Sequence, residues 1–266
     1  MPGLDVVSVT FNSSKFLPRL ADAINALTDV ESITMVDNGS TDDTLEVTRR
    51  IAWSAPMTQK SLDNPGFGAA MNVGVAFGSA EYVLLLNPDV DVSREVIMGL
   101  LEVLEASDAT AAVTCQLTTT SGQPVSSARH FPTRTSIVRR RAREVDHGGA
   151  VVQADWLCGA LMLWKRSAFE AVGGFGAEYF LYYEDVDICA TARRMGMDVK
   201  IAGGLTAIHD QGHGAPTSDF LRRVSRESRK KYAHKWLGVS GYLAAVLADC
   251  LEYASVRYHR LRKAGS

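Results

Sequence analysis

Cysteine is scarce in this sequence, with four in 266 residues, and there is no CxxC pair or Cys–His pairing. The four are Cys115, Cys158, Cys189 and Cys250. Zinc knuckles need closely spaced ligands, and small disulfide scaffolds need a high density of cysteines. The sequence therefore predicts neither kind of site, and it fits a reducing cytoplasm.

Long hydrophobic runs and an excess of charge are also absent. No segment reaches the roughly 18 apolar residues of a transmembrane helix, and no cationic leader precedes the strand-like sequence that starts at Leu4. Lys and Arg total 28 against 30 Asp and Glu, a net charge of -2, so the whole molecule has no strong attraction for nucleic acid. We expect a soluble or peripheral protein.

The sequence does contain an alternation of strand and helix patterns. Strands are predicted over 4–10, 33–36 and 82–86, and helices over 16–27, 45–52 and 69–77. This alternation predicts βαβ units, hence an α/β fold with a mostly parallel central sheet flanked by helices. The 46% hydrophobic content supports one large domain, residues 1–217, followed by a helical extension, residues 218–266, first basic and then apolar.

The second half is less regular. Residues 126–149 are predicted to be a long polar loop that carries a basic cluster, Arg139 to Arg143. A strand is predicted over 158–164 and a short helix over 166–172. A further helix is predicted from the acidic run at 184–187 to Gly196.

Small or hydrogen-bonding residues stand at four consecutive strand–helix junctions, where ligands of open α/β sheets bind. Asp37 can accept hydrogen bonds from a nucleobase or ribose, and glycines let backbone N–H groups approach a phosphate. A single such turn is ordinary turn chemistry, but four together favour a ligand site. The candidate residues are Thr10, Asn12, Asp37, Asn38, Gly66, Gly68 and Asn87.

The apolar run that begins at Val83 ends abruptly in acid. Pro88 stops the strand, and Asp89 and Asp91 follow it. Carboxylates of this kind bind Mg²⁺ or Mn²⁺ when the ion also holds a substrate phosphate. An Asn-Pro-Asp turn without a ligand is the alternative.

A second acidic run, Glu184-Asp185-Val186-Asp187, follows the aromatic pair Tyr182-Tyr183. Carboxylates beside bulky apolar groups are candidates for general-base or metal chemistry, and a solvated helix start is the alternative. A helix amino terminus lowers the pKa of a carboxyl group, whereas neighbouring carboxylates raise it, and the sequence leaves the balance open for Asp185.

These segments together resemble glycosyltransferase family 2, the inverting GT-A enzymes, and within it the rhamnosyltransferase-like branch. The resemblance covers about residues 4–215. It rests on Val9 to Ser13, Val36 to Asp42, Asn64 to Gly68, Leu86 to Asp89, and Gly173 to Asp187. It implies a GT-A nucleotide-diphospho-sugar transferase fold with a helical carboxyl-terminal tail.

The resemblance also implies a donor site for a dTDP- or UDP-sugar. Thr10, Asn12 and Asp37 are expected to hold the base and ribose. The rest of the expected donor site is Asn38, Gly66, Gly68 and Asn87.

By the same resemblance Asp89 takes the last position of a DxD-type metal motif whose first acid is replaced by Asn87. His209 lies in a segment that closes over the diphosphate, where its imidazole is expected to bind the metal or to hydrogen-bond a phosphate, with a loop histidine of no special role as the alternative. Mg²⁺ or Mn²⁺ is the expected cofactor. Asp185 matches the catalytic base, and the acceptor site is expected to include Trp156, Tyr183 and Glu184.

The implied function is a metal-dependent, inverting hexosyltransferase of polysaccharide or cell-wall biosynthesis. It moves a sugar such as rhamnose to a hydroxyl of a cell-envelope or polyprenyl-diphosphate-linked glycan. The first alternative is a nucleotidyltransferase, which needs a Gly-rich triphosphate loop that residues 10–16 lack. The second is a non-catalytic nucleotide-sugar-binding protein of the same fold.

The basic tail has two interpretations. Arg and Lys residues between Phe220, Tyr232 and Trp236 are typical of a solvated helix face, and they also suit an interfacial helix on anionic lipid. We expect a cytoplasmic protein with peripheral contact at the inner face of the plasma membrane. A packing or homodimer helix is the alternative.

Overall fold

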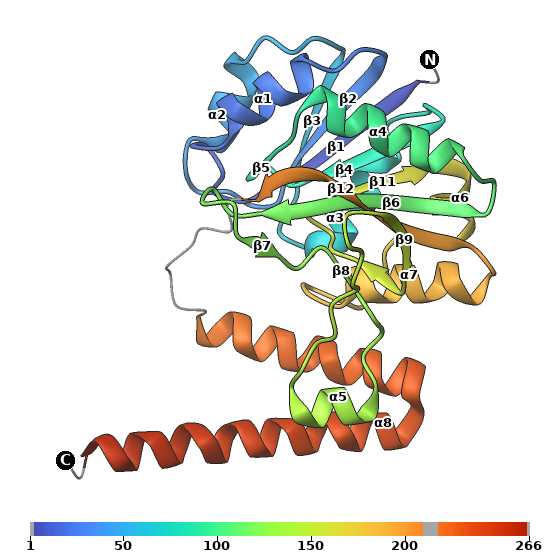
Figure 1. The fold of residues 1–266 in the computed structure, drawn as a ribbon. Helices are drawn as coiled ribbons and strands as arrows, with labels where there is room; N and C mark the ends of the chain where they lie inside the picture. Colours follow the sequence, from blue (N-terminus) through green and yellow to red (C-terminus); the bar gives the residue numbers. More distant parts are fainter. Residues whose placement is uncertain (1–2, 210–217, 265–266) are drawn as a thin grey trace.

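The computed structural model describes residues 3–209 and 218–264, with side chains to residue 254. In these residues a ten-stranded sheet has the order β3-β2-β1-β4-β11-β6-β12-β5, with β7 beside β6 and β9 beside β12. Helices cover both of its faces (Figure 1). The first half comprises β1 (Leu4–Thr10), α1 (Leu17–Asn25), β2 (Val30–Asp37), α2 (Thr44–Arg50), β3 (Met57–Ser61), α3 (Phe67–Val75) and β4 (Tyr82–Leu86).

The second half mixes strand directions. Its elements are β5 (Val90–Asp91), α4 (Arg94–Glu105), β6 (Thr110–Thr118), β7 (Pro124–Val125), β8 (Ala128–Arg129), α5 (Arg134–Arg139), β9 (Val151–Ala154), β10 (Trp156–Leu157), β11 (Leu161–Lys165), α6 (Arg166–Ala171), α7 (Glu184–Arg194), β12 (Asp198–His209) and α8 (Asp219–Ala264). β1 to β4 pair in parallel as predicted, whereas β11 is antiparallel to both β4 and β6.

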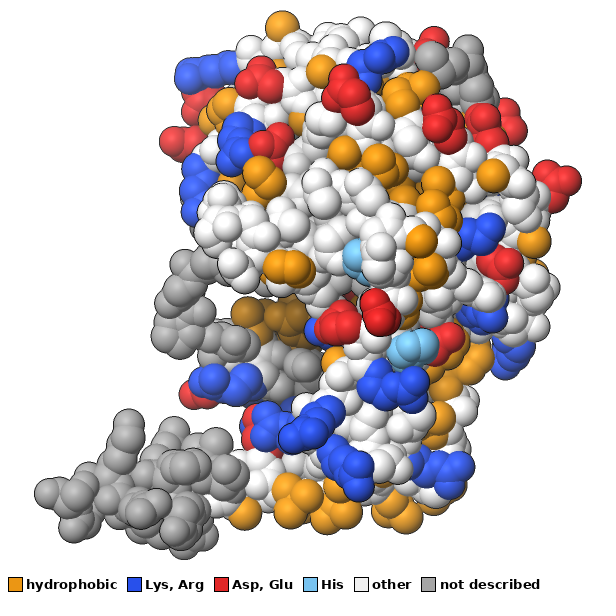
Figure 2. Space-filling model, viewed as in Figure 1, with side chains coloured by type: hydrophobic (Ala, Val, Ile, Leu, Met, Phe, Trp, Pro, Cys, Tyr) orange, Lys and Arg blue, Asp and Glu red, His pale blue; other side chains and the backbone are white. Residues whose placement is uncertain are grey.

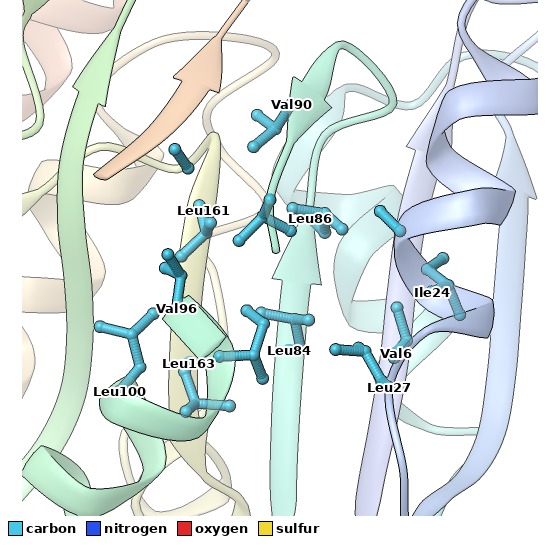
Figure 3. Close-up of a cluster of buried hydrophobic side chains, with 14 of the residues drawn as sticks. Val6, Ile24, Leu27, Leu84, Leu86, Val90, Val96, Leu100, Leu161 and Leu163 are labelled. Atoms are coloured by element: carbon cyan, nitrogen blue, oxygen red, sulfur yellow. The ribbon is translucent and has the colours of Figure 1, made fainter. Parts of the chain in front are cut away.

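The core is built around β4, because both of its faces are covered. Its residues Val83 to Leu86 are fully buried. Side chains alternate across a strand, so Leu84 and Leu86 pack with α1 and α4, while Val83 and Leu85 pack on the other side with α3 and α7. Figure 3 shows the first of these clusters, with Ile24 and Leu100 facing β4. This packing fixes the carboxyl end of β4, where the candidate metal ligands begin.

Two expectations for the second half are wrong. Residues 126–149 are not simply a loop, because they form β8, α5 and a bridge between Arg129 and Glu144. The strand predicted over 158–164 begins only at Leu161, as β11, because a turn at Gly159 separates it from β10. A Cβ atom at position 159 would lie 3.4 Å from Phe67 and 3.6 Å from Asp185. The turn is therefore a point of close packing, which a hydrophobic run does not reveal.

Helix α8 consists of two arms, residues 219–237 and residues 239–264. Gly238 joins them with φ 68° and ψ -162°, a conformation that is essentially restricted to glycine. The arms fold back on each other beside α5 (Figure 1), and Ile137 of α5 packs with Ala233, Ala244, Ala245 and Ala248. Ion pairs across the arms, such as Arg226–Glu252 at 3.0 Å, hold this hairpin together.

The side chains exposed on α8 are not those of the basic, aromatic face that the sequence predicted. Tyr232 is only 2% exposed, and Arg229 and Lys230 of the first arm both pair with Asp249 of the second. The basic, aromatic face proposed for lipid is therefore partly internal. The large apolar residues that are exposed on the second arm are Val239, Tyr242, Leu243, Leu247, Leu251 and Tyr253.

We predicted that no segment is long and apolar enough to span a membrane. As far as length and composition are concerned, this prediction is also wrong. One helix, Asp219–Ala254, meets those criteria with a mean hydropathy of 1.2 in its most apolar part. The charges that interrupt this helix, including Asp249 and Glu252, form ion pairs within the hairpin. Ionised groups are costly in hydrocarbon, so this packing favours a helix that lies at a surface over one that spans.

Candidate active site

The carboxyl ends of β1, β2 and β4 meet at one cavity of about 560 Å³, which we call the sheet-edge pocket. The first residues of α8 form its opposite wall. The polar lining residues except Ser218 come from the predicted strand–helix junctions, and the apolar ones include Phe67 and Phe220. The polar members are Asn12, Ser13, Asn38, Asn64, Asn87, Asp89 and Ser218.

Two amide oxygens in this pocket are prepared for a ligand. The Oδ1 atoms of Asn38 and Asn87 are buried and accept no hydrogen bond within the described part of the chain. The Asn38 side chain is held in place by its Nδ2, which donates to Asn64 Oδ1 at 3.0 Å. Because an unsatisfied buried acceptor is costly, these oxygens are suited to a ligand donor or, for Asn87, to a cation.

Thr10 and Asp37 stabilise the loop beside the sheet-edge pocket. Both are buried and neither lines it. Thr10 Oγ1 donates to Asp37 at 3.2 Å, and the Ser40 N–H donates to the same carboxylate at 3.0 Å. Asn12 does line the pocket, while its Oδ1 accepts from the Thr41 N–H at 2.8 Å. In this structure the hydrogen-bonding groups expected to face a base and ribose instead order the loop.

Gly66 and Gly68 do not line the pocket, and their hydrogens face protein. A Cβ atom at Gly66 would lie 2.4 Å from the Phe180 carbonyl oxygen, and one at Gly68 would lie 2.8 Å from Phe175. The first N–H of α3, at Phe67, donates to that same Phe180 oxygen at 2.9 Å. The glycines thus let α3 approach the 175–184 segment, and their expected contact with phosphate finds no support here.

Asp89 and His209 come together although 120 positions separate them in the sequence. β12 runs antiparallel to β5 with His209 opposite Val90, so the imidazole Nε2 lies 3.4 Å from Asp89 Oδ1. With the Asn87 oxygen nearby in sequence, the donor set is oxygen-rich with one imidazole, which fits Mg²⁺ or Mn²⁺. No group of three His, Cys, Asp or Glu side chains suited to a metal exists among the described residues. Asp91 pairs instead with Arg19.

Asp185 lies in the first turn of α7, after Tyr182 and Tyr183, whose φ values of 68° and 70° are unusual for residues other than glycine. Its carboxylate accepts from the Gly159 N–H at 3.2 Å and the Val186 N–H at 2.9 Å. Burial raises its pKa to about 6, against the lowering effect of these donors and of Arg129. The balance that the sequence left open is therefore decided by burial, and the result suits a general base.

The other two carboxylates of the run have different surroundings. Glu184 is buried, and its burial together with the charge of Asp185 raises its pKa well above the ordinary value. Glu184 does not line the cavity that opens beside Asp185, so its predicted contact with the acceptor is not supported. Asp187 accepts from Trp236 at 2.6 Å and Lys235 at 2.8 Å. It therefore anchors α8 to α7.

A second cavity, of about 390 Å³, opens beside Asp185 between α5, α7 and α8. We call it the arginine pocket. The predicted acceptor residues Trp156 and Tyr183 line it. Figure 2 shows Lys and Arg side chains gathered on this side of the molecule. Its cationic lining residues are Arg129, Arg140, Arg141, Arg143 and Arg229.

These arginines were not predicted as site residues. Arg129 lies 5.6 Å from the centre of the Trp156 ring and pairs with Glu144 at 2.7 Å. The basic clusters at 139–143 and 222–231 were a visible signal in the sequence, but nothing in it indicated that the two face one another. Residues 210–217, which include part of the segment expected to cover the diphosphate, lie outside the described residues.

Comparison with known proteins adds a sequence relationship. The model of Glycosyl transferase family 2 matches residues 5–170. N-acetylglucosaminyl-diphospho-decaprenol L-rhamnosyltransferase of Mycobacterium tuberculosis is 26% identical over 240 residues, which are 79% of this chain and 76% of that protein. Rhamnosyltransferase WbbL of Escherichia coli K12 is 24% identical over 225 residues, 78% of this chain and 83% of that protein.

A solved structure shares the architecture. The mannosyltransferase PcManGT from Pyrobaculum calidifontis, in complex with GDP-Man and Mn²⁺, superposes with a TM-score of 0.62 at 16% sequence identity. The match covers 92% of this chain and 69% of that one. At this level of identity the likeness concerns the fold.

Proposed function

Because the chain belongs to glycosyltransferase family 2, we propose that it transfers a hexose, with rhamnose as first candidate, from a nucleoside-diphosphate sugar to a glycan hydroxyl. The rhamnosyltransferase-like branch and the GT-A fold implied by the sequence are both confirmed. The chain is therefore a glycosyltransferase, which excludes the nucleotidyltransferase alternative. Donor, acceptor, metal use and inversion belong to our proposal.

The observation that carries the proposal is the position of Asp185 between two cavities. Its carboxylate lines the arginine pocket and accepts from the Gly159 N–H. Gly159 in turn lies against Phe67, which lines the sheet-edge pocket. A donor in one pocket and an acceptor in the other would meet beside this carboxylate.

We assign the donor to the sheet-edge pocket. Its volume of about 560 Å³ is in the range of small-molecule sites, and the orphan oxygens of Asn38 and Asn87 give it donor-seeking polar groups. Asp89, His209 and Asn87 are the residues we expect to hold Mg²⁺ or Mn²⁺. When bound, that ion neutralises charge on the leaving diphosphate. The Mn²⁺ and GDP-Man of the related mannosyltransferase support this assignment.

Asp185 would act as the general base. Its carboxylate takes the proton of the acceptor hydroxyl while the hydroxyl oxygen bonds to the anomeric carbon. The bond from that carbon to the diphosphate oxygen breaks, and the diphosphate leaves from the opposite face, so the configuration inverts. A pKa near 6 leaves the carboxylate ionised at neutral pH while keeping it more basic than an ordinary Asp.

We further propose that the acceptor is lipid-linked and that the second arm of α8 lies on the inner face of the plasma membrane. Val239, Leu243, Leu247 and Leu251 are spaced by four residues and are each at least 49% exposed. Residues at this spacing share one helix face, so the row is suited to an interfacial helix. The diphospho-decaprenol acceptor in the name of the mycobacterial relative supports this direction.

The donor can be identified by thermal stabilisation with a panel of dTDP-, UDP- and GDP-sugars, with Mn²⁺ and in chelator. A cognate donor raises the apparent melting temperature through mass action. We expect stabilisation by one nucleotide class only when the metal is present, and release of nucleoside diphosphate once an acceptor is added. A panel that never stabilises the protein contradicts the donor assignment. Stabilisation without transfer to any acceptor favours the non-catalytic binding protein.

A further inference from the structure

We propose that the arginine pocket binds a phosphate or diphosphate group of the acceptor, adjacent to the hydroxyl that Asp185 deprotonates. This inference rests on the proposed function and adds the residues that would bind the phosphates of the acceptor. A neutral glycan would need hydrogen-bonding and aromatic groups, whereas a phosphorylated acceptor needs fixed cations. The charges of the pocket distinguish the two.

The lining is strongly unbalanced in charge. It contains five arginines and one carboxylate, that of Asp185. Carboxylates outside the lining compensate three of the arginines: Arg129 pairs with Glu144, Arg140 with Glu252, and Arg229 with Asp249. Arg141 and Arg143 have no carboxylate partner among the described residues. The pocket therefore keeps an excess of positive charge after internal pairing.

The backbone at Arg140 adopts an unfavourable conformation, which brings Arg141 and Arg143 to the pocket. Arg140 ends α5 in the left-handed region, with φ 53°, and its N–H donates to the Ile137 oxygen at 3.1 Å. Side chains other than glycine are disfavoured in this region. The turn carries Arg141, Ala142 and Arg143 to the wall of the pocket, while Arg134 and Arg139 of the same segment line no described cavity. Crowded like charges repel, so an anion bound between them would relieve the repulsion.

The anion in question is distinct from the diphosphate of the donor. The arginine pocket and the sheet-edge pocket share no lining residue. A third hollow, of about 370 Å³, continues the arginine pocket and shares Arg140, Tyr182, Ser225 and Arg229 with it. It adds Arg222, Arg226, Glu252 and Leu221, the last of which also lines the sheet-edge pocket. Glu252 is the sequence neighbour of Leu251 in the exposed apolar row. This arrangement suits an acceptor with a sugar at Asp185, phosphates at the arginines and a lipid beyond them.

The test compares two double variants of equal charge. Arg141→Gln with Arg143→Gln removes the uncompensated charges of the pocket, and Arg134→Gln with Arg139→Gln removes two from the outer side of the same segment. Titration calorimetry with geranyl diphosphate, and separately with inorganic diphosphate, measures binding. We expect the pocket variant to bind geranyl diphosphate about 10- to 100-fold more weakly than wild type, because each arginine contributes a charge-assisted hydrogen bond. The outer variant should bind as wild type does.

Two further measurements identify the source of the phosphate. Nucleoside diphosphate with Mn²⁺ should bind equally to all three proteins, since its site is the other pocket. Phosphatidylglycerol vesicles should bind both double variants equally, because the same charge is removed from each. If the pocket variant alone loses vesicle binding, the arginines recognise lipid headgroups and the acceptor proposal is overturned.

Equal affinity of the pocket variant and wild type for geranyl diphosphate would also overturn it. Such a result leaves the glycosyltransferase proposal intact, because that one is tested by donor binding and by transfer. Conversely, a protein that transfers no sugar but binds geranyl diphosphate through Arg141 and Arg143 would contradict the proposed function alone. The circular dichroism spectrum and melting temperature of each variant check that the fold is retained.

Discussion

The two pockets on either side of Asp185 are built in opposite ways. The sheet-edge pocket is lined by residues that follow β1, β2 and β4 and by Phe180, Leu181 and the start of α8, and its polar groups are mostly neutral amides. The arginine pocket is assembled from β8, α5, the start of α7 and the first arm of α8, and its polar groups are mostly guanidinium ions. In the first site a buried sheet fixes most of the polar groups in space. In the second site most of the charged groups depend on the docking of a helical hairpin.

This difference indicates a division of labour. A pocket at strand ends, lined mostly by neutral amides with two orphan oxygens, is suited to a common cofactor-like substrate, such as a nucleotide. A charged pocket on peripheral helices is suited to a substrate that differs between relatives, because surface segments change without disturbing the core. We therefore expect variants of the two pockets to separate donor binding from acceptor use.

The largest expected effect is that of Asp185→Asn, which removes the proposed base at the wall of the arginine pocket. Transfer should fall about 10²- to 10⁴-fold, the usual contribution of a general base, while nucleotide binding in the sheet-edge pocket persists. Single-turnover transfer and calorimetry measure the two properties. Asp146→Asn, an exposed carboxylate outside both pockets, is the control. Near-normal turnover of Asp185→Asn would remove this residue from the mechanism.

The second effect concerns delivery of the acceptor to the arginine pocket. Leu243→Ser with Leu247→Ser should reduce co-sedimentation with anionic vesicles about tenfold or more, because burying a leucine contributes roughly 1.5–3 kcal/mol. Activity on a short soluble acceptor should not change. Met195→Ser, at an exposed methionine outside α8, is the control. If wild type never binds vesicles and sediments as a dimer that the leucine variant dissociates, the row is a dimer interface.

A third effect should be confined to the sheet-edge pocket. Asp89→Asn should weaken nucleoside diphosphate binding about tenfold or more in Mn²⁺, because it removes a ligand from a site with few protein ligands. In chelator its binding should equal that of wild type. Asp91→Asn, two residues away but paired with Arg19, is the matched control. Equal weakening with and without metal would mean that Asp89 contacts the nucleotide or supports the fold.

The smallest effect is a shift in pH dependence. Asp185 must be ionised to accept a proton, so kcat/KM should rise with pH through an apparent pKa of about 6 and then level off. Arg129→Gln removes a cation that favours the carboxylate, and should move this rise to higher pH by roughly half a unit. Glu184→Gln should leave it almost unchanged, because burial and the charge of Asp185 already favour the neutral form of Glu184. An unchanged pH profile of the Arg129→Gln variant would contradict the electrostatic origin of the pKa.

The sequence predicted the sheet-edge region well because its signals are local. The strands over 4–10 and 82–86 agree with β1 and β4, and the junctions after them meet at one cavity as expected. The resemblance assigned Asp89 and His209 each to the metal site, and the structure brings their side chains together. Prediction failed where one residue type serves several structural roles, as glycine does. Gly66 was assigned to phosphate, but the close approach of Phe180 explains it.

The sequence by itself determined the α/β fold class and the parallel first half of the sheet, because hydrophobic periodicity and turn residues are local properties of the chain. The choice of Asp185 as the candidate base came from the resemblance to glycosyltransferase family 2. Tertiary structure decided the direction of the Asp185 pKa shift, the inward pairing of Arg229 with Asp249, and the meeting of two basic clusters in one pocket. Desolvation and Coulomb energies depend on distances through space, and the fold alone brings these groups from separate segments together.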